Sequence, residues 1–252
     1  IGGTSNSIGM AIAPLVISYL IFHGTPLHDI VTKQFIIPLI ILILIMLIIT
    51  ILVGKTQMPS IDNVRQVPGE KFDKSVWSFR NLKLGVWGIF FYVGIEVAVG
   101  ANVNMYASEL GGSFASNATH MAALYWGLLL LGRFLGSFIK QVPSEKQLVI
   151  ASIGAIVLLV LAMLTANPWI LTLIGFFHSI MWPAIFTLAT DQLGKYTTKA
   201  SGVLTMGVIG GGIIPLLQGI FADVMGGNWL WTWLLVIAGE AYILYYGLNG
   251  YK

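Results

Sequence analysis

The chain has 252 residues, of which 57% are hydrophobic and only 9% are charged, and its net charge is +3. Ordinary soluble domains carry about 25% charged residues, so this composition predicts an integral membrane protein. The absence of cysteine excludes a disulfide framework and a thiolate metal site. The H-E-x-x-H and G-x-S-x-G patterns of hydrolases are also missing from the sequence. We therefore expect no enzyme activity, no metal and no organic cofactor.

Eight segments are apolar and close to the length of about 20 residues that a helix needs to cross a bilayer. They lie at 2–22, 34–53, 81–107, 119–139, 147–166, 168–190, 199–222 and 229–249. These segments predict an all-α bundle of eight transmembrane helices surrounded by lipid.

The first span carries the pattern T-x-x-x-I-G-x-x-I-x-P-L at residues 4–15, and the pattern returns at residues 205–216 in the seventh span. A proline-broken, glycine-rich helix repeated in two halves is typical of secondary transporters. Asn6 and Gln218 lie beside the two breaks, so we expect both to line a cavity, with ordinary helix packing as the alternative. Because the first copy stands so near the start of the sequence, we expect about four earlier helices to be missing. We do not expect such a fragment to transport by itself.

Residues 54–80 separate the second and third spans, and they are polar, with two prolines and charges of both signs. This segment predicts a linker between two bundles. We therefore expect residues 1–53 to be the last two helices of an N-terminal bundle. Residues 81–252 should then form a C-terminal bundle of six helices.

Glu96 lies near the middle of the third span. A carboxylate at this depth is costly and usually serves a pathway or a partner. Tyr92 lies one helical turn earlier on the same face, and Asn102 follows nearer the far end. Carboxylates and amides form directional hydrogen bonds with sugar hydroxyls, and a phenol ring can stack on a pyranose. We expect these residues to bind substrate, with a structural acid paired to a neighbouring helix as the alternative.

Arg133 ends the fourth span and Asp191 follows the sixth, at the same predicted end of the bundle. We expect Arg133 to act as a gate or a loop anchor, with Asp191 and Lys195 as its partners. A solvated surface pair is the alternative.

His178 and Trp182 lie four residues apart in the sixth span, next to Pro183, which loosens the backbone there. Tryptophan is a good stacking surface for a sugar, and histidine can carry a proton near neutral pH. We expect both side chains to line the cavity. For the histidine, a hydrogen bond between helices is the alternative.

Glu240 lies at the centre of the last span. The last helix of a half often stands outside the cavity, so the sequence leaves open a structural role, an oligomer contact, and a substrate or proton role. Trp229, Trp231 and Trp233 open this span, and we expect them to form an interfacial aromatic belt.

Twelve of the 13 Lys and Arg residues fall on one side of the alternating spans, with Lys33 opposite. By the positive-inside rule, this side is cytoplasmic, together with the linker and both chain ends. Basic residues distributed in this way do not indicate a nucleic-acid partner.

Five stretches of the chain resemble one known family. They are NSIGMAIAP (6–14), FYVGIEVAVG (91–100), GRFLGS (132–137), SIMWPAIFTLA (179–189) and LGKYTTKASGVLTMGVIGGGIIPLLQGIFAD (193–223). The chain resembles the fucose/glucose–galactose permease family of the major facilitator superfamily, the fucose:proton symporter branch, over helices five to twelve of a twelve-helix fold. The resemblance implies proton-coupled import of a monosaccharide of the fucose, glucose or galactose class by alternating access. It also implies an inner-membrane protein that is monomeric at full length.

Glu96 falls at the glutamate of the family pattern Y-V-G-x-E-V, so the resemblance gives it a role in the sugar site. The acids most tied to proton coupling in the family lie in the first and fourth helices, outside this chain. The family commonly has glutamine three residues before the Asn of N-S-x-G, whereas this chain has Gly3. This departure leaves the identity of the substrate open.

Two other functions fit the sequence. The same scaffold could carry another small solute, including by efflux. The chain could also be a transport-inactive membrane receptor or scaffold, although no large domain that would favour this reading is visible in the sequence.

Overall fold

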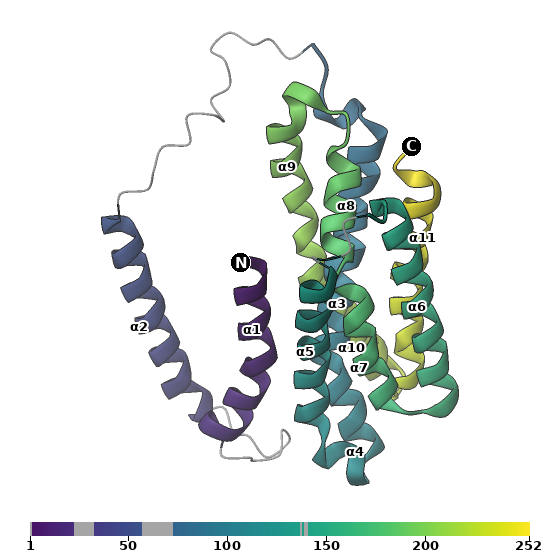
Figure 1. Ribbon diagram of the computed structural model, residues 1–252. Helices are drawn as coiled ribbons and strands as arrows, with labels where there is room; N and C mark the ends of the chain where they lie inside the picture. The colour runs from purple at the N-terminus through teal and green to yellow at the C-terminus, as the bar shows by residue number, and fades with distance from the viewer. Residues whose placement is uncertain (1, 23–32, 57–72, 137, 139–140) are drawn as a thin grey trace. The chain divides into compact units, whose positions relative to one another are not determined.

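The computed structural model describes the chain except for residues 1, 23–32, 57–72, 137 and 139–140 (Figure 1). The described residues form helices and turns, and no strand occurs among them. The chain divides into two compact units. Unit 1 comprises Ile1–Pro14 and Phe72–Lys252, and unit 2 comprises Leu15–Lys71.

In unit 2, the predicted second span forms α2 (Lys33–Lys55). The most apolar stretch of 18 residues in this helix has a mean hydropathy of 3.5, and none of that stretch is buried within the protein. A helix whose exposed side chains are apolar on every side is suited to contact with lipid or with other helices rather than with water. Unit 2 also holds the π-helical turn Val16–Ile21, which forms the later part of the predicted first span. Helix α1 (Gly2–Leu15), which belongs to unit 1 as far as Pro14, forms the earlier part.

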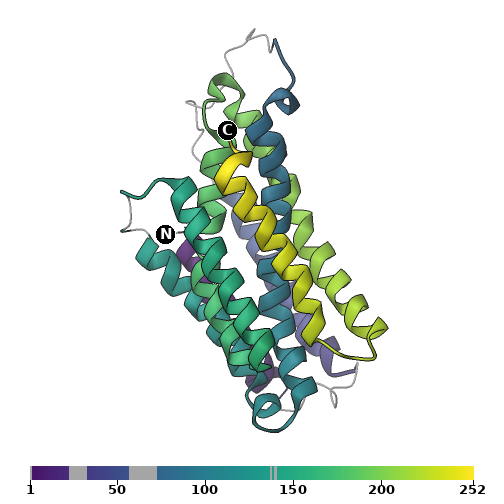
Figure 2. The ribbon, with the colours of Figure 1, turned by 90° about the vertical axis from the view of Figure 1, so that its right-hand side faces the viewer.

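In unit 1, α3 (Arg80–Leu110) is the central helix. It packs against α5, α7, α8, α10 and α11 (Figures 1 and 2). Small residues on α3 and its neighbours permit this close packing, as is usual in membrane bundles. At Gly210, for example, an added Cβ would overlap the backbone of Phe90. Gly210 thus permits close contact between α10 and α3, whereas a Cβ at Gly212 would meet nothing within 4 Å in the described part of the chain.

Eight further described helices follow α3 in unit 1, of which the first lies between two predicted spans and two divide the seventh predicted span. They are α4 (Gly112–Ser116), α5 (Ala118–Gly136), α6 (Ser144–Thr165), α7 (Pro168–His178), α8 (Met181–Thr190), α9 (Thr197–Thr205), α10 (Gly210–Val224) and α11 (Trp233–Tyr245). The sixth span is not one helix, because it breaks between α7 and α8. Short 3-10 turns precede α10 and α11, and a π-helical turn, Tyr246–Gly250, follows α11. Among the described residues, five stretches are long and apolar enough to cross a membrane.

Hydrogen bonds define one end of unit 1. Arg80 donates to the carbonyl oxygens of Asn249, Gly250 and Lys252 at the end of the chain. Lys195 forms a 3.1 Å ion pair with Asp73. Basic residues from distant parts of the sequence therefore meet at this end, as the positive-inside argument requires.

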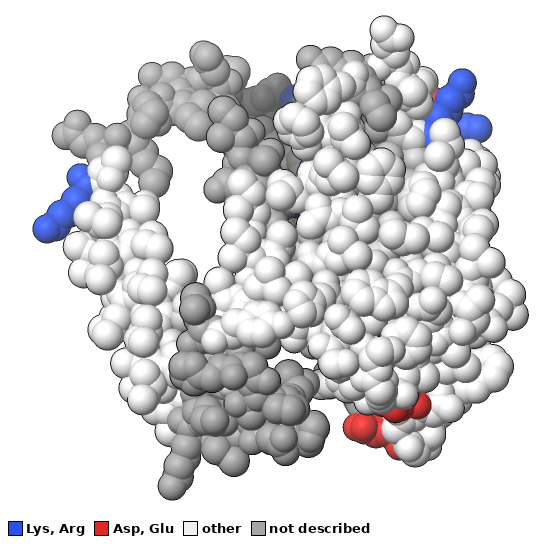
Figure 3. All heavy atoms as spheres, turned by 60° about the horizontal axis from the view of Figure 1, so that its bottom comes forward, with Lys and Arg blue, Asp and Glu red and all other residues white. Residues whose placement is uncertain are grey.

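At the opposite end, a carboxylate oxygen of Glu109 accepts a hydrogen bond from the backbone amide of Trp229 at 2.9 Å. Figure 3 brings this end of the protein toward the viewer, and few charged atoms interrupt its uncharged surface. The cytoplasmic assignment of the basic end stays a prediction.

The predicted aromatic belt is only partly correct. Trp231 is 51% exposed, as a residue at a membrane interface should be. Trp233 is fully buried and packs edge to face on Tyr106, with 5.9 Å between ring centroids. Its placement in the belt was wrong, because two residues along a helix rotate the side chain by about 200° to another face.

Candidate functional site

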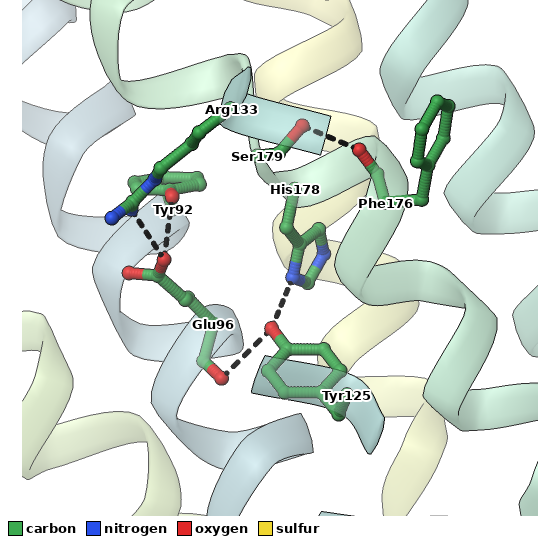
Figure 4. Close-up of polar contacts among 7 residues, drawn as sticks. All are labelled: Tyr92, Glu96, Tyr125, Arg133, Phe176, His178 and Ser179. Atoms are coloured by element: carbon green, nitrogen blue, oxygen red, sulfur yellow. Dashed lines mark hydrogen bonds and ion pairs between the residues drawn. The ribbon is translucent and has the colours of Figure 1, made fainter. Parts of the chain in front are cut away.

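Glu96 forms the centre of a buried polar site in unit 1. Its Oε1 accepts a hydrogen bond from the Tyr92 hydroxyl at 2.7 Å and forms an ion pair with Arg133 Nη2 at 3.1 Å (Figure 4). The Glu96 side chain is 9% exposed and that of Arg133 is 22% exposed. Tyr92 and Glu96 share a face of α3 because four residues make about one helical turn. The arginine comes from α5, so the acid is paired across two helices.

A second row of contacts continues from the backbone of Glu96. The Tyr125 hydroxyl on α5 donates to the Glu96 carbonyl oxygen at 3.0 Å and lies 2.7 Å from His178 Nδ1. His178 Nε2 lies 2.6 Å from Glu240 Oε1 on α11. Tyr125, His178 and Glu240 are fully buried. Together with Tyr92, Glu96 and Arg133, these residues form what we call the ionisable cluster, which joins α3, α5, α7 and α11.

Two glycines allow α5 and α7 to approach closely enough for these contacts. A Cβ at Gly175 on α7 would overlap the carbonyl group of Tyr125, and a Cβ at Gly132 on α5 would overlap Ser179. Close helix contacts of this kind need small residues at the interface. The approach places Tyr125 and His178 within hydrogen-bonding distance.

The break between α7 and α8 also shapes the site. Proline has no N–H, and its ring clashes with the carbonyl four residues earlier, so Pro183 disfavours a regular helix at Ser179. Helix α7 accordingly ends at His178, and α8 begins at Met181. The Ser179 hydroxyl donates to the Phe176 carbonyl at 2.6 Å (Figure 4). His178 therefore sits at the last position of a short helix in the interior of the bundle.

Aromatic rings surround the polar contacts. The Tyr92 ring lies 6.2 Å from the ring of His178 and 6.2 Å from the ring of Trp182, measured between centroids. Trp182 is only partly buried. A partly exposed indole next to the tyrosine that bonds a carboxylate is an arrangement that can hold a sugar ring and its hydroxyls.

Asn102 and Gln218 belong to a separate polar group. Asn102 Nδ2 donates to Gln218 Oε1 at 2.9 Å, and Gln218 Nε2 donates to the Thr232 hydroxyl at 3.1 Å. Thr232 in turn donates to the Trp229 carbonyl at 2.7 Å. We call Asn102, Gln218 and Thr232 the amide cluster. It joins α3 and α10 to the start of the last span, and its members bond chiefly to one another.

The structure thus brings together five of the residues singled out in the sequence, namely Tyr92, Glu96, Arg133, His178 and Trp182. The side chain of Asn6 lies outside the described residues. The Asp191 carbonyl accepts a hydrogen bond from Asn81 at 3.0 Å, and Lys195 pairs with Asp73. Arg133, expected to be a gate or a loop anchor with Asp191 and Lys195 as its partners, pairs with Glu96.

Sequence reasoning missed Tyr125 and Thr232, and it left Glu240 without a partner. Tyr125 stands in an apolar helix, where a buried aromatic is ordinary, so its sequence carried no functional signal. Glu240 and His178 are 62 residues apart, a separation at which no helical periodicity connects them. Among the described residues, no group of three His, Asp or Glu side chains could hold a metal ion.

The model of the family described as "Major Facilitator Superfamily" matches residues 1–213. The chain is 34% identical to a putative glucose/galactose transporter of Helicobacter pylori strain J99, over 98% of this chain and 64% of that protein. It is also 34% identical to a glucose/galactose transporter of Brucella abortus biovar 1, covering 98% of this chain and 61% of the relative. The L-fucose-proton symporter of Escherichia coli K12 is 28% identical over 75% of this chain and 45% of its own length.

A crystal structure of the transporter FucP in the outward conformation superposes with a TM-score of 0.71 and 25% identity. The match covers 98% of this chain and 66% of that one. The chain spans less than two thirds of the length of the glucose/galactose transporters that it matches. These relatives are transporters, which confirms the prediction that the chain is not an enzyme. On this evidence, and on its all-helical fold, the chain belongs to the Major Facilitator Superfamily.

Proposed function

We propose that this chain forms part of a carrier that imports a monosaccharide together with protons by alternating access. The names of its relatives support a sugar as substrate, and the name of the fucose symporter supports the proton as coupling ion. The inner membrane, a cytoplasmic basic end and a monomeric full-length protein belong to the same proposal.

The observation that carries the proposal is the hydrogen bonding of the two Glu96 carboxylate oxygens. Both of its contacts reach Oε1, and Oε2 has no hydrogen-bond partner among the described residues. A carboxylate held on one oxygen by an arginine and a tyrosine keeps its other oxygen available to accept from a ligand hydroxyl. A purely structural acid would be expected to have both oxygens occupied.

In the proposed site, a sugar hydroxyl donates to Glu96 Oε2, and one face of the sugar ring stacks on Trp182. The Tyr92 hydroxyl holds the carboxylate in place, and the Tyr92 ring lines the sugar site. We assign Asn102 and Gln218 chiefly to holding α3 against α10, because their amides already bond to each other. Asp191 stays a candidate for the gate at the basic end, and Asn6 stays a candidate for lining the substrate cavity.

The proposal is tested by counterflow with the full-length natural protein in proteoliposomes. Vesicles loaded with unlabelled fucose, glucose or galactose should take up the same labelled sugar faster than vesicles without protein. An inward proton gradient should then drive accumulation of that sugar. If no hexose or deoxyhexose exchanges, the sugar assignment is wrong, and another solute on the same scaffold becomes the better reading.

Glu96→Gln gives the sharper test of the site. The amide keeps the shape of the side chain but replaces a charged acceptor with a neutral group, so sugar affinity should fall about 10-fold or more. Glu109→Gln is the matched control, because it makes the same change on an exposed residue of the same helix. Wild-type uptake by the Glu96 variant would remove this residue from the sugar site.

A further inference from the structure

The row formed by Tyr125, His178 and Glu240 lies behind the proposed sugar site and has no evident part in holding a sugar. All three side chains are fully buried. Glu240 Oε2 has no hydrogen-bond partner within the described part of the chain. A buried acid and a buried base in direct contact inside a membrane protein call for a specific explanation.

Counting the hydrogens of this row shows how many protons it holds. The Tyr125 hydroxyl has one hydrogen and lies within hydrogen-bonding distance of two atoms, the Glu96 carbonyl oxygen at 3.0 Å and His178 Nδ1 at 2.7 Å. When the hydroxyl donates to the carbonyl, which can only accept, Nδ1 must carry a hydrogen of its own. The 2.6 Å contact between His178 Nε2 and Glu240 Oε1 requires another hydrogen between those two atoms. With all three contacts formed as hydrogen bonds, the row carries both protons.

Loss of one proton has a defined geometric result. If the Nδ1 proton leaves, the Tyr125 hydroxyl must rotate to donate to Nδ1, while Nε2–H continues to donate to the Glu240 carboxylate. One proton is released, and no covalent bond between heavy atoms changes. The only hydrogen bond that is lost is the one from Tyr125 to the Glu96 carbonyl.

From this geometry we propose that Tyr125, His178 and Glu240 form a proton-binding site with one exchangeable proton, which Tyr125 links to the segment of α3 that carries Glu96. The proton site itself does not depend on the identity of the substrate. Its use for coupling rests on the proposed function as a sugar importer.

The charged and titratable groups around the row support this assignment. Tyr92 and Glu96 face it from α3, and Arg133 on α5 pairs with Glu96 rather than with the row. On the adjoining α6 the buried polar side chain is Ser152, and on α8 Trp182 lies against Tyr92, and neither side chain titrates. With both protons the His178–Glu240 pair has no net charge. Loss of one proton leaves a buried negative charge, which is costly unless water reaches the site.

Nitrogen-15 spectra of histidine in the full-length natural protein test the proton site directly, and loss of a signal in His178→Gln assigns that signal. We expect two forms of His178, a loaded form with both ring nitrogens protonated and an unloaded form with only Nε2 protonated. Tyr125→Phe removes one more hydrogen bond from the loaded form than from the unloaded form. The ratio of loaded to unloaded form, compared at one pH, should therefore fall about 5- to 10-fold.

Tyr106→Phe is the matched control, because the buried Tyr106 hydroxyl has no hydrogen-bond partner among the described residues. This variant should leave the ratio of the two forms as it is in the wild type. If His178 keeps one protonation pattern over the whole pH range in which the protein stays folded, the proton site is refuted. A ratio that does not respond to Tyr125→Phe refutes the link through Tyr125.

Transport measurements distinguish the coupling of sugar uptake to protons from simple sugar exchange. Glu240→Gln removes the carboxylate that neutralises the doubly protonated His178, so the row can no longer hold both protons without a buried charge. We expect sugar counterflow within about twofold of wild type and loss of most proton-driven accumulation. Ser152→Ala, a buried change on α6, is the control and should leave both activities intact. Full accumulation by Glu240→Gln would refute coupling through this site. Failure of the wild type to carry any sugar would refute the proposed function, while the histidine spectra would still decide the proton site.

Discussion

The ionisable cluster and the amide cluster both lie inside unit 1, but they differ in chemistry. In the ionisable cluster, Glu96 and Glu240 each have one oxygen without a hydrogen-bond partner among the described residues. In the amide cluster, Asn102, Gln218 and Thr232 bond in sequence to one another and to a backbone carbonyl. Of the two clusters, only the one whose groups can change charge keeps unbonded oxygens. Burial alone therefore does not identify a functional site, and an unbonded atom does not do so either, because the buried hydroxyl groups of Tyr106 and Ser152 also lack partners among the described residues.

The largest effect that separates the two clusters is expected from Arg133→Met. Removing one partner of a buried ion pair costs about 3–5 kcal/mol, and the partial exposure of Arg133 places this case near the lower end of that range. The thermal stability of the full-length protein in detergent should fall accordingly, and uptake should be lost. Adding Glu96→Gln should recover most of the stability, because the unpaired charge is then gone. If the double variant is as unstable as the single one, Arg133 stabilises the bundle by packing rather than by charge.

An intermediate effect is expected from Gly175→Ala. The added methyl group meets the Tyr125 carbonyl, so α5 and α7 must move apart, at a cost of about 1–3 kcal/mol. The same movement separates Tyr125 from His178. Gly127→Ala on α5 is the control, since its Cβ meets nothing within 4 Å. Equal stabilities of the two variants would show that close approach of these helices does not hold the ionisable cluster together.

The smallest effect is expected from Gln218→Leu in the amide cluster. Hydrogen bonds between membrane helices contribute about 0.6 kcal/mol on average, because the unfolded chain also finds partners in the membrane. We expect a stability loss of about 1 kcal/mol or less and sugar affinity within about threefold of wild type. A much larger loss of affinity, measured by counterflow at several sugar concentrations, would bring the amide cluster into the sugar site.

Hydropathy predicted the helices well, because the free energy of membrane insertion depends on the apolarity of each segment alone. Helical spacing likewise predicted that Tyr92 and Glu96 share a face, which their hydrogen bond confirms. The partner of Arg133 could not be predicted, since a long side chain at a helix end can point to solvent or into the bundle. The break before Pro183 had a signal in the sequence, but the exact residues at which α7 ends and α8 begins depend on packing against α5.

The pairing of His178 with Glu240 has a consequence for how the protein is made. The two residues are 62 positions apart in the sequence, so the ribosome completes the histidine helix well before its acid exists. At about 5–20 residues per second, the delay is about 3–12 s. During that interval the histidine must stay neutral or wait beside the translocon, because an unpaired charge in lipid costs several kcal/mol. Insertion of the α7–α8 segment should therefore be completed only after α11 has been synthesised. The end of the chain is then required before its middle can assemble in the membrane.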